Sequence, residues 1–298
     1  MGILYLAALF LLWAGRQGKV SRRLAAVVSV FCLLAGSGAL SAAVVPFGNG
    51  YGKTVNRLSD MSGNGKLSAP VSAVACQTDA SESGKTVPSV AASGRCIALT
   101  FDDGPYPPYT NRLLDILKEK KVCVTFFLVA EQAQKHPELV KRLTSEGHTI
   151  GLHAFLHRDF LKLTEEEKRK DLETGRKALH AITGKDPVFW RPPHGFRDFS
   201  VMEIAAAQKL TVVNWSVAPR DWTGIDKQEI HHRVMDKAED GAIVLLHDGD
   251  SPFYKASRQA TVDAVPLLID SLREKGYHLV SLEEYMQAKT AVKALQEK

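Results

Sequence analysis

The chain has 298 residues, of which 45% are hydrophobic and 24% charged, proportions typical of a globular protein and not of a disordered, collagen-like or disulfide-dense chain. The net charge is +5, but residues 1–95 hold 9 basic and 3 acidic side chains, so the 29 basic and 30 acidic side chains of residues 96–298 nearly cancel. The basic excess belongs to the N-terminal region, and no nucleic-acid partner is expected.

Residues 1–46 are predicted to form an N-terminal membrane segment. Residues 24–45 contain no charged side chain, and as a helix these 22 residues are long enough to cross a hydrocarbon core of about 30 Å. A shorter apolar run at 2–15 precedes them, and the basic cluster at 16–23 favours a cytoplasmic position for the connection. We therefore expect a cell-membrane anchor with the following domain outside the cytoplasm. The alternative is a long signal, cleaved near residues 41–43, which would lead to secretion of the domain.

Residues 47–94 are rich in Gly, Ser, Ala, Thr and Asn and lack a sustained apolar period. This composition is typical of a linker, so the segment is predicted to be a flexible stalk. The sequence permits a disulfide between two of Cys76, Cys96 and Cys123. Buried free thiols are favoured at Cys96 and Cys123.

From residue 95 onward, short apolar runs alternate with amphipathic stretches. Strands that are apolar on both faces and separated by helices indicate a parallel sheet, and repeated right-handed crossovers favour closure into a barrel. The expected fold is α/β, a distorted (β/α) barrel of seven or eight strands over residues 95–288 with a C-terminal tail helix at 289–298. Function is expected at the carboxyl ends of the strands. Strands are predicted at 97–101, 122–129, 149–152, 188–190, 210–214, 243–246 and 278–280, and helices at 109–120, 137–146, 164–183, 200–209, 227–237, 259–275 and 282–298.

Polar clusters stand at those carboxyl ends. The first strand runs into Asp102 and Asp103, within TFDDGP, and the third runs into His153 and His157. In a helical turn, histidines four residues apart project from the same side and can hold one metal ion. One carboxylate with two imidazoles is a facial ligand set that leaves positions open for water or substrate. Each pair alone also fits a turn or chance spacing, so the prediction depends on both pairs lying at the same end of different strands.

Three further clusters follow the next strands, FWRPPHGF at 189–196, WSVAPRDW at 215–222 and VLLHD at 244–248. The order TFDDGP, HxxxH, RPPxG, DW and LLH resembles the NodB-type polysaccharide deacetylases, carbohydrate esterase family four, over about residues 95–285. The resemblance implies a distorted barrel and a divalent ion, usually zinc, with cobalt, nickel or manganese as alternatives. It also implies removal of the acetyl group from an N-acetylated sugar, or in some members from an O-acetylated one.

The same resemblance implies roles for individual residues. Asp103, His153 and His157 would bind the metal. Asp102 would be the general base, held by Arg191, and His247 would be the general acid, its state set by Asp221. Trp222 and Leu245 would line the acetyl methyl, and the main-chain N–H at His194 would stabilise the oxyanion.

The chain departs from the family pattern at two positions. Ala154 stands where the family commonly has Ser or Thr, so a supporting hydroxyl is missing and weaker metal binding is expected. His194 stands where the family often has Tyr, a change expected to affect substrate shape more than rate.

Two other functions are alternatives to deacetylation. A non-catalytic glycan-binding module with the same fold is the main alternative, and phosphoryl transfer is disfavoured because the sequence has no Gly-rich phosphate loop. The expected partner is a polysaccharide, peptidoglycan first and chitin-like glycan next, and the expected state is a monomer. Phe253 and Tyr254 are candidates for stacking on a sugar ring.

Overall fold

The computed structural model describes residues 54–61, 95–250 and 257–296. The expected membrane segment, most of the expected stalk, Cys76, Phe253 and Tyr254 lie outside these ranges. Within them, none of the helices combines the length and the hydrophobicity needed to cross a bilayer. Cys96 and Cys123 are buried, as predicted.

The described strands form a seven-stranded parallel sheet in the order β5-β4-β3-β2-β1-β6, and β7 pairs with the first residues of β1. Each predicted strand is present, although three are shorter than expected. Residues 122–124 precede β2, and the Val122 N–H donates to Leu117 O at the end of the preceding helix. The strands are β1 (Arg95–Asp102), β2 (Thr125–Val129), β3 (Thr149–Ala154), β4 (Phe189–Trp190), β5 (Thr211–Val212), β6 (Ala242–His247) and β7 (Tyr277–Leu279).

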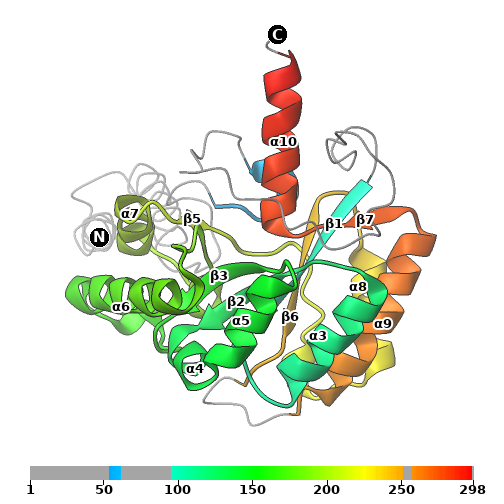
Figure 1. Cartoon of the computed structure of the whole chain (residues 1–298), viewed down its shortest axis with the longest axis horizontal. Helices are drawn as coiled ribbons and strands as arrows, with labels where there is room; N and C mark the ends of the chain where they lie inside the picture. Colours follow the sequence, from blue (N-terminus) through cyan, green and yellow to red (C-terminus); the bar gives the residue numbers. More distant parts are fainter. Residues whose placement is uncertain (1–53, 62–94, 251–256, 297–298) are drawn as a thin grey trace, which may run out of the picture.

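Helices surround this sheet in Figure 1. The longest, α6, begins with a capping box between Thr164 and Glu167 and ends at Gly184, whose φ of 70° is the left-handed conformation that glycine adopts easily. Among the α-helices of the described residues, only α4 was not predicted, because six residues are too few to show a helical period. The helices are α3 (Tyr109–Lys120), α4 (Ala130–Lys135), α5 (Pro137–Ser145), α6 (Glu165–Thr183), α7 (Phe199–Ala207), α8 (Lys227–Lys237), α9 (Gln259–Glu274) and α10 (Leu282–Gln296).

Strand alternation decides which side chains face the helices and which face the inside. In β1, Leu99 and Phe101 belong to the main core against the helices, whereas Ala98 belongs to a second core on the other face. Because side chains alternate along a strand, Thr100 and Asp102 share the inner face with Ala98. The same period brings His153 of β3 and His247 of β6 to the inner face, since their neighbours in the strand pack in the main core.

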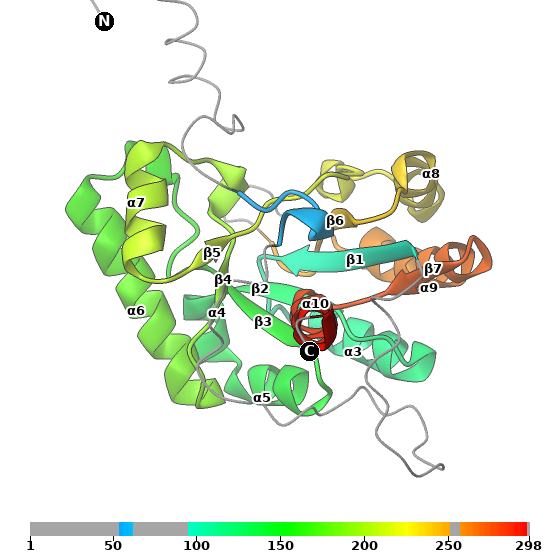
Figure 2. The same ribbon diagram turned by 90° about the horizontal axis from the view of Figure 1, so that it is seen from above.

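The two edges of the sheet, β5 and β6, are joined by residues outside the strands. The segment Thr54–Met61 lies close to both edges, and Figure 2 shows it in blue above β1 and next to β6. The connecting bridges join Val55 with Val213, Arg57 with Ala242, and Val217 with Val244.

Thr54–Met61 is therefore part of the folded domain, which differs from the flexible stalk predicted over residues 47–94. Val55, Leu58 and Met61 are buried in the second core. Three apolar residues in a polar, Gly-rich context are too few to reveal a strand or a helix from the sequence. These residues adopt a defined conformation because they fill the gap between β5 and β6.

Helix α10 begins inside the predicted catalytic domain and continues past residue 288, so the predicted boundary with a tail helix at 289–298 falls within one helix. The Leu282 N–H donates to Thr125 Oγ1 at the first residue of β2. The helix therefore starts at the amino end of the sheet, opposite the predicted site. Figure 1 shows the rest of α10 projecting away from the body.

Candidate active site

The turn after β1 brings two adjacent carboxylates to one side. Asp102 is the last residue of β1, and Asp103 has a φ of 74°. Neighbouring residues of a regular strand point to opposite faces, and this left-handed residue breaks the alternation. As a result, Asp103 Oδ1 lies 3.4 Å and Asp102 Oδ2 4.0 Å from the same atom, His153 Nε2. Gly104 is required next, because a Cβ there would lie 2.2 Å from Asp248 Oδ2.

The three predicted metal ligands converge. Asp103 Oδ1 lies 3.2 Å from His157 Nε2, and one ligand atom from each of Asp103, His153 and His157 lies within 4.8 Å of the other two. Asp103 Oδ1 is buried and, among the described residues, has no hydrogen-bond partner. A buried carboxylate oxygen without a donor, facing two imidazole nitrogens, fits a divalent cation. The predicted helical turn between the histidines is wrong, because His153 lies in β3 and His157 in the following loop.

Protonation states suit this ligand set. Burial alone would raise the pKa of Asp103, but the neighbouring imidazoles of His153, His157 and His247 hold that pKa well below its usual range. Burial, reinforced by the neighbouring His153 and His194 and opposed by Asp103, lowers the pKa of His157 to about 4. At neutral pH the site therefore offers an ionised carboxylate and a neutral imidazole, the forms that bind a metal.

His153 is oriented by the main chain. Its Nδ1 lies 2.6 Å from Arg191 O, so an Nδ1–H donor leaves the Nε2 lone pair facing Asp103. The Trp190 indole N–H donates to His153 O at 3.0 Å. His157 differs, because its Nδ1 is buried and has no partner in the described part of the chain. The ring of His194 lies edge-on to His157, with the centroids 4.8 Å apart.

Asp102 is held by a fully buried arginine. Arg191 Nη1 donates to Asp102 Oδ1 at 2.6 Å and to Thr100 Oγ1 at 2.8 Å. Its other nitrogens donate to main-chain carbonyls, Nε to Val213 O at 3.1 Å and Nη2 to Asn214 O at 2.8 Å. With these partners the guanidinium has one orientation, so Asp102 Oδ1 is fixed and Oδ2 remains on the side of the histidines.

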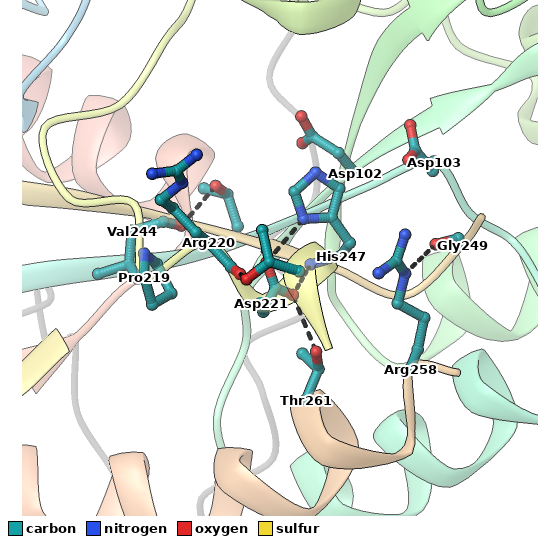
Figure 3. A network of polar contacts seen from close by, with 12 residues as sticks. Asp102, Asp103, Pro219, Arg220, Asp221, Val244, His247, Gly249, Arg258 and Thr261 are labelled. Atoms are coloured by element: carbon teal, nitrogen blue, oxygen red, sulfur yellow. Dashed lines mark hydrogen bonds and ion pairs between the residues drawn. The ribbon is translucent and has the colours of Figure 1, made fainter. Parts of the chain in front are cut away.

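A second acid–imidazole pair lies opposite Asp102. Asp221 Oδ1 lies 2.9 Å from His247 Nδ1, and Asp221 Oδ2 accepts the His247 main-chain N–H at 2.9 Å and the Thr261 hydroxyl at 2.8 Å. Figure 3 shows the His247 ring between Asp221 and Asp102. Burial opposes a charge on this ring, but Asp221, with smaller contributions from Asp103 and Asp102, raises the pKa of His247 to about 9. His247 is therefore a cation at neutral pH.

The remaining predicted residues lie around these pairs. The ring of Trp222 is edge-on to His247, with the centroids 5.1 Å apart. Leu245 is buried two residues before His247, hence on the same face of β6. His194 has a φ of 60° within a single turn, Pro193–Gly195, close to the metal ligands.

Several supporting residues were not assigned a role from the sequence. Thr100 lies within TFDDGP, and Asp248 follows LLH directly, so both could have been noticed there. Asp248 is fully buried, Thr110 Oγ1 donates to its Oδ2 at 2.5 Å, and burial raises the pKa of Asp248 to about 7. Thr261, on α9, lies in no motif, and only the three-dimensional packing places it beside Asp221.

Comparisons with known proteins point to one family. Residues 89–213 match the family described as polysaccharide deacetylase. The chain is 36% identical over 191 residues to a peptidoglycan-N-acetylglucosamine deacetylase of Bacillus cereus, covering 64% of this chain and 68% of that protein. It is 34% identical over 206 residues to a chitooligosaccharide deacetylase of Sinorhizobium fredii, covering 67% and 96%. The solved structure of peptidoglycan deacetylase PdaC from Bacillus subtilis matches with a TM-score of 0.60 and 34% identity, over 68% of this chain and 96% of that one.

Proposed function

This chain belongs to the polysaccharide deacetylase family, and we propose that the site described above removes acetyl groups from an N-acetylated glycan and releases acetate. The observation that carries the proposal is the convergence of three pairings at one end of the sheet. Asp103 faces His153 and His157, Asp102 is bound by Arg191, and His247 is bound by Asp221. Amide hydrolysis needs an electrophilic centre, a base and an acid, and each pairing suits one of these tasks.

Asp103, His153 and His157 would hold a divalent cation, and we propose zinc, because one carboxylate oxygen and two imidazole nitrogens suit a catalytic zinc site with an open position. When bound, such an ion polarises an acetyl carbonyl and lowers the pKa of a water molecule. The main-chain N–H of His194 is proposed to donate to the oxyanion that forms on the acetyl oxygen.

Asp102 is proposed to take the proton of the attacking water. Arg191 Nη1 donates to Asp102 Oδ1, which leaves Oδ2 as the accepting atom. Four donated hydrogen bonds hold Arg191, so the base cannot rotate away during the reaction. A base fixed in one orientation lowers the barrier because less reorganisation is needed when the proton moves.

His247 is proposed to protonate the leaving amine. Asp221 accepts a hydrogen bond at Nδ1, so Nε2 is the atom that carries the transferable proton. After water has added to the carbonyl and given one proton to Asp102, the carbon–nitrogen bond breaks. The nitrogen takes the His247 proton and leaves as the amine, and the acyl group, which now carries the water oxygen, is released as acetic acid, which ionises to acetate. Leu245 and Trp222, beside His247, are proposed to contact the acetyl methyl.

Peptidoglycan is the proposed substrate, and chitin-like glycan is the second candidate, because relatives of both kinds align with this chain. The test is acetate release by the purified protein from peptidoglycan and from N-acetylchitooligosaccharide, before and after chelator treatment and after addition of zinc. We expect release from both, faster from peptidoglycan, lost with the chelator and restored by zinc. Glycan binding without acetate release in any condition would support the non-catalytic module instead.

We also propose that the domain works outside the cytoplasm, as a monomer, either held at the cell membrane by residues 1–46 or secreted. The support is the uncharged run at 24–45 with the basic cluster before it. To test this, the full chain is expressed with a C-terminal tag, the cells are fractionated, and intact spheroplasts are exposed to protease. Recovery of the tag in the soluble cytoplasmic fraction, resistant to protease, would contradict the proposal.

A further inference from the structure

The loop between the two metal histidines has little support from its own side chains. Ala154 carries no hydrogen-bonding group, and His157 Nδ1 is buried without a partner in the part of the chain that the structure describes. The orientation of His157 must therefore come from the main chain that carries it. Groups outside the loop must hold that main chain.

One buried carboxylate on α6 does so. Asp171 is 3% exposed, and its Oδ1 accepts the main-chain N–H of Phe155 at 2.7 Å. Its Oδ2 accepts the N–H of Leu156 at 3.3 Å and Arg158 Nη2 at 3.4 Å. Phe155 and Leu156 lie between His153 and His157. Charge-assisted hydrogen bonds in a buried position are stronger than neutral ones, so this carboxylate fixes the course of the loop.

The same face of α6 is shaped to approach the loop. Gly175 lies one turn after Asp171, and a Cβ there would lie 2.8 Å from Leu152 Cδ1 and 3.1 Å from the Phe155 nitrogen. The helix backbone can therefore come this close only with glycine. On the other side, Phe155 O accepts the N–H of Glu131 in α4 at 3.1 Å. Both main-chain groups of Phe155 are thus fixed from outside the loop.

We propose that Asp171 is a positioning residue of the metal site, which holds His157 in place through the main chain of Phe155 and Leu156. The inference rests on the proposed function, because it assumes that the two histidines bind a metal ion. Loss of such an indirect support typically weakens metal affinity by about 10- to 100-fold. Asp171 itself does not touch the metal ligands' side chains, so its effect is expected on affinity for the ion before any effect on fold.

The test measures zinc affinity of the purified full chain by competition with a chromophoric chelator. Asp171→Asn keeps the size of the side chain but replaces one acceptor oxygen with an NH₂ group, and we expect affinity to fall about 10- to 100-fold. Asp171→Glu keeps the carboxylate, and its affinity should lie closer to that of the parent. If only the shape of the side chain mattered, Asp171→Asn would keep an affinity closer to that of the parent than Asp171→Glu would. Glu173→Gln, at an exposed position of the same helix, is the matched control and should leave affinity within about twofold.

Hydrogen exchange provides a second readout in the metal-free protein. The amides of Phe155 and Leu156 should exchange faster in Asp171→Asn than in the parent, because their acceptor is weakened. If Asp171→Asn does not fold, both measurements are made on Asp171→Ser, which also lacks the carboxylate. Unchanged exchange of these amides, or zinc affinity equal to that of the parent, in the variant without the carboxylate would overturn the proposal. Failure of the parent itself to bind zinc would instead refute the proposed function.

Discussion

Substitution of Asp221 by Asn should convert His247 from a cation to a neutral ring at working pH. The pKa of His247 is raised from 6.5 to about 9, chiefly by the Asp221 carboxylate against the cost of burial. This difference corresponds to about 3 kcal/mol at about 1.4 kcal/mol per pKa unit. An amide supplies no negative charge while burial remains, so the pKa should fall to about 6.5 or lower. At pH 7.5 the protonated fraction would then drop from about 97% to about 9% or less.

The assay is the pH dependence of acetate release, whose basic limb reports the general acid. We expect the basic limb of the parent to lie near pH 9 and that of Asp221→Asn at least two pH units lower, with a roughly tenfold or greater loss of rate at pH 7.5 and partial recovery near pH 6. Asp236→Asn, at an exposed position of α8, serves as the control and should keep the parent profile. A basic limb at the same pH in parent and Asp221→Asn would refute the assignment.

The same pair links stability to pH. Because the pKa of His247 is raised on folding, its contribution is fully present below about pH 6.5 and is lost as the pH rises through about 9. Urea unfolding of the parent should therefore show a fall in the free energy of unfolding across this window, of up to about 3 kcal/mol from this group. The fall should be smaller in Asp221→Asn, and equal slopes in both proteins would contradict the linkage.

Three further predictions concern the base, the ligands and the N-terminal segment. Asp102→Asn should lower the rate of acetate release by about 10²- to 10⁴-fold while zinc content, measured by mass spectrometry, stays that of the parent; full turnover would remove the general-base role. His153→Ala should lose both zinc and activity, and retention of stoichiometric zinc would contradict its place as a ligand. Leu58→Asp should lower the free energy of unfolding by about 3 kcal/mol or more, because it buries a carboxylate without a partner; urea unfolding equal to that of the parent would show that Thr54–Met61 is not needed by the fold.

The regular elements of the domain could be predicted because each carries its own local signal. The strands are short apolar runs, and α6 has a capping box at Thr164 and a glycine at its end. Thr54–Met61 carries no such signal, because its order comes from bridges to residues more than 150 positions away. α4 is similarly hidden, since it is only six residues long and directly follows β2.

The candidate site shows the same division. Asp102, Asp103, His153 and His157 follow predicted strands, so their meeting at one end of the sheet could be expected from the sequence. Their detailed geometry could not, because it depends on the left-handed φ of Asp103 and on a strand where a helical turn was expected. Supporting groups such as Thr261 and Asp171 come from helices whose contacts only tertiary packing determines.

A crystal of the zinc-loaded protein would show whether Asp103, His153 and His157 share one cation. Anomalous scattering at the zinc edge should show an ion bound by one oxygen of Asp103 and by Nε2 of each histidine, at about 2.0–2.2 Å. Zinc-loaded crystals with no anomalous peak among these three side chains, or with the peak at another position, would show that these residues do not form the metal site.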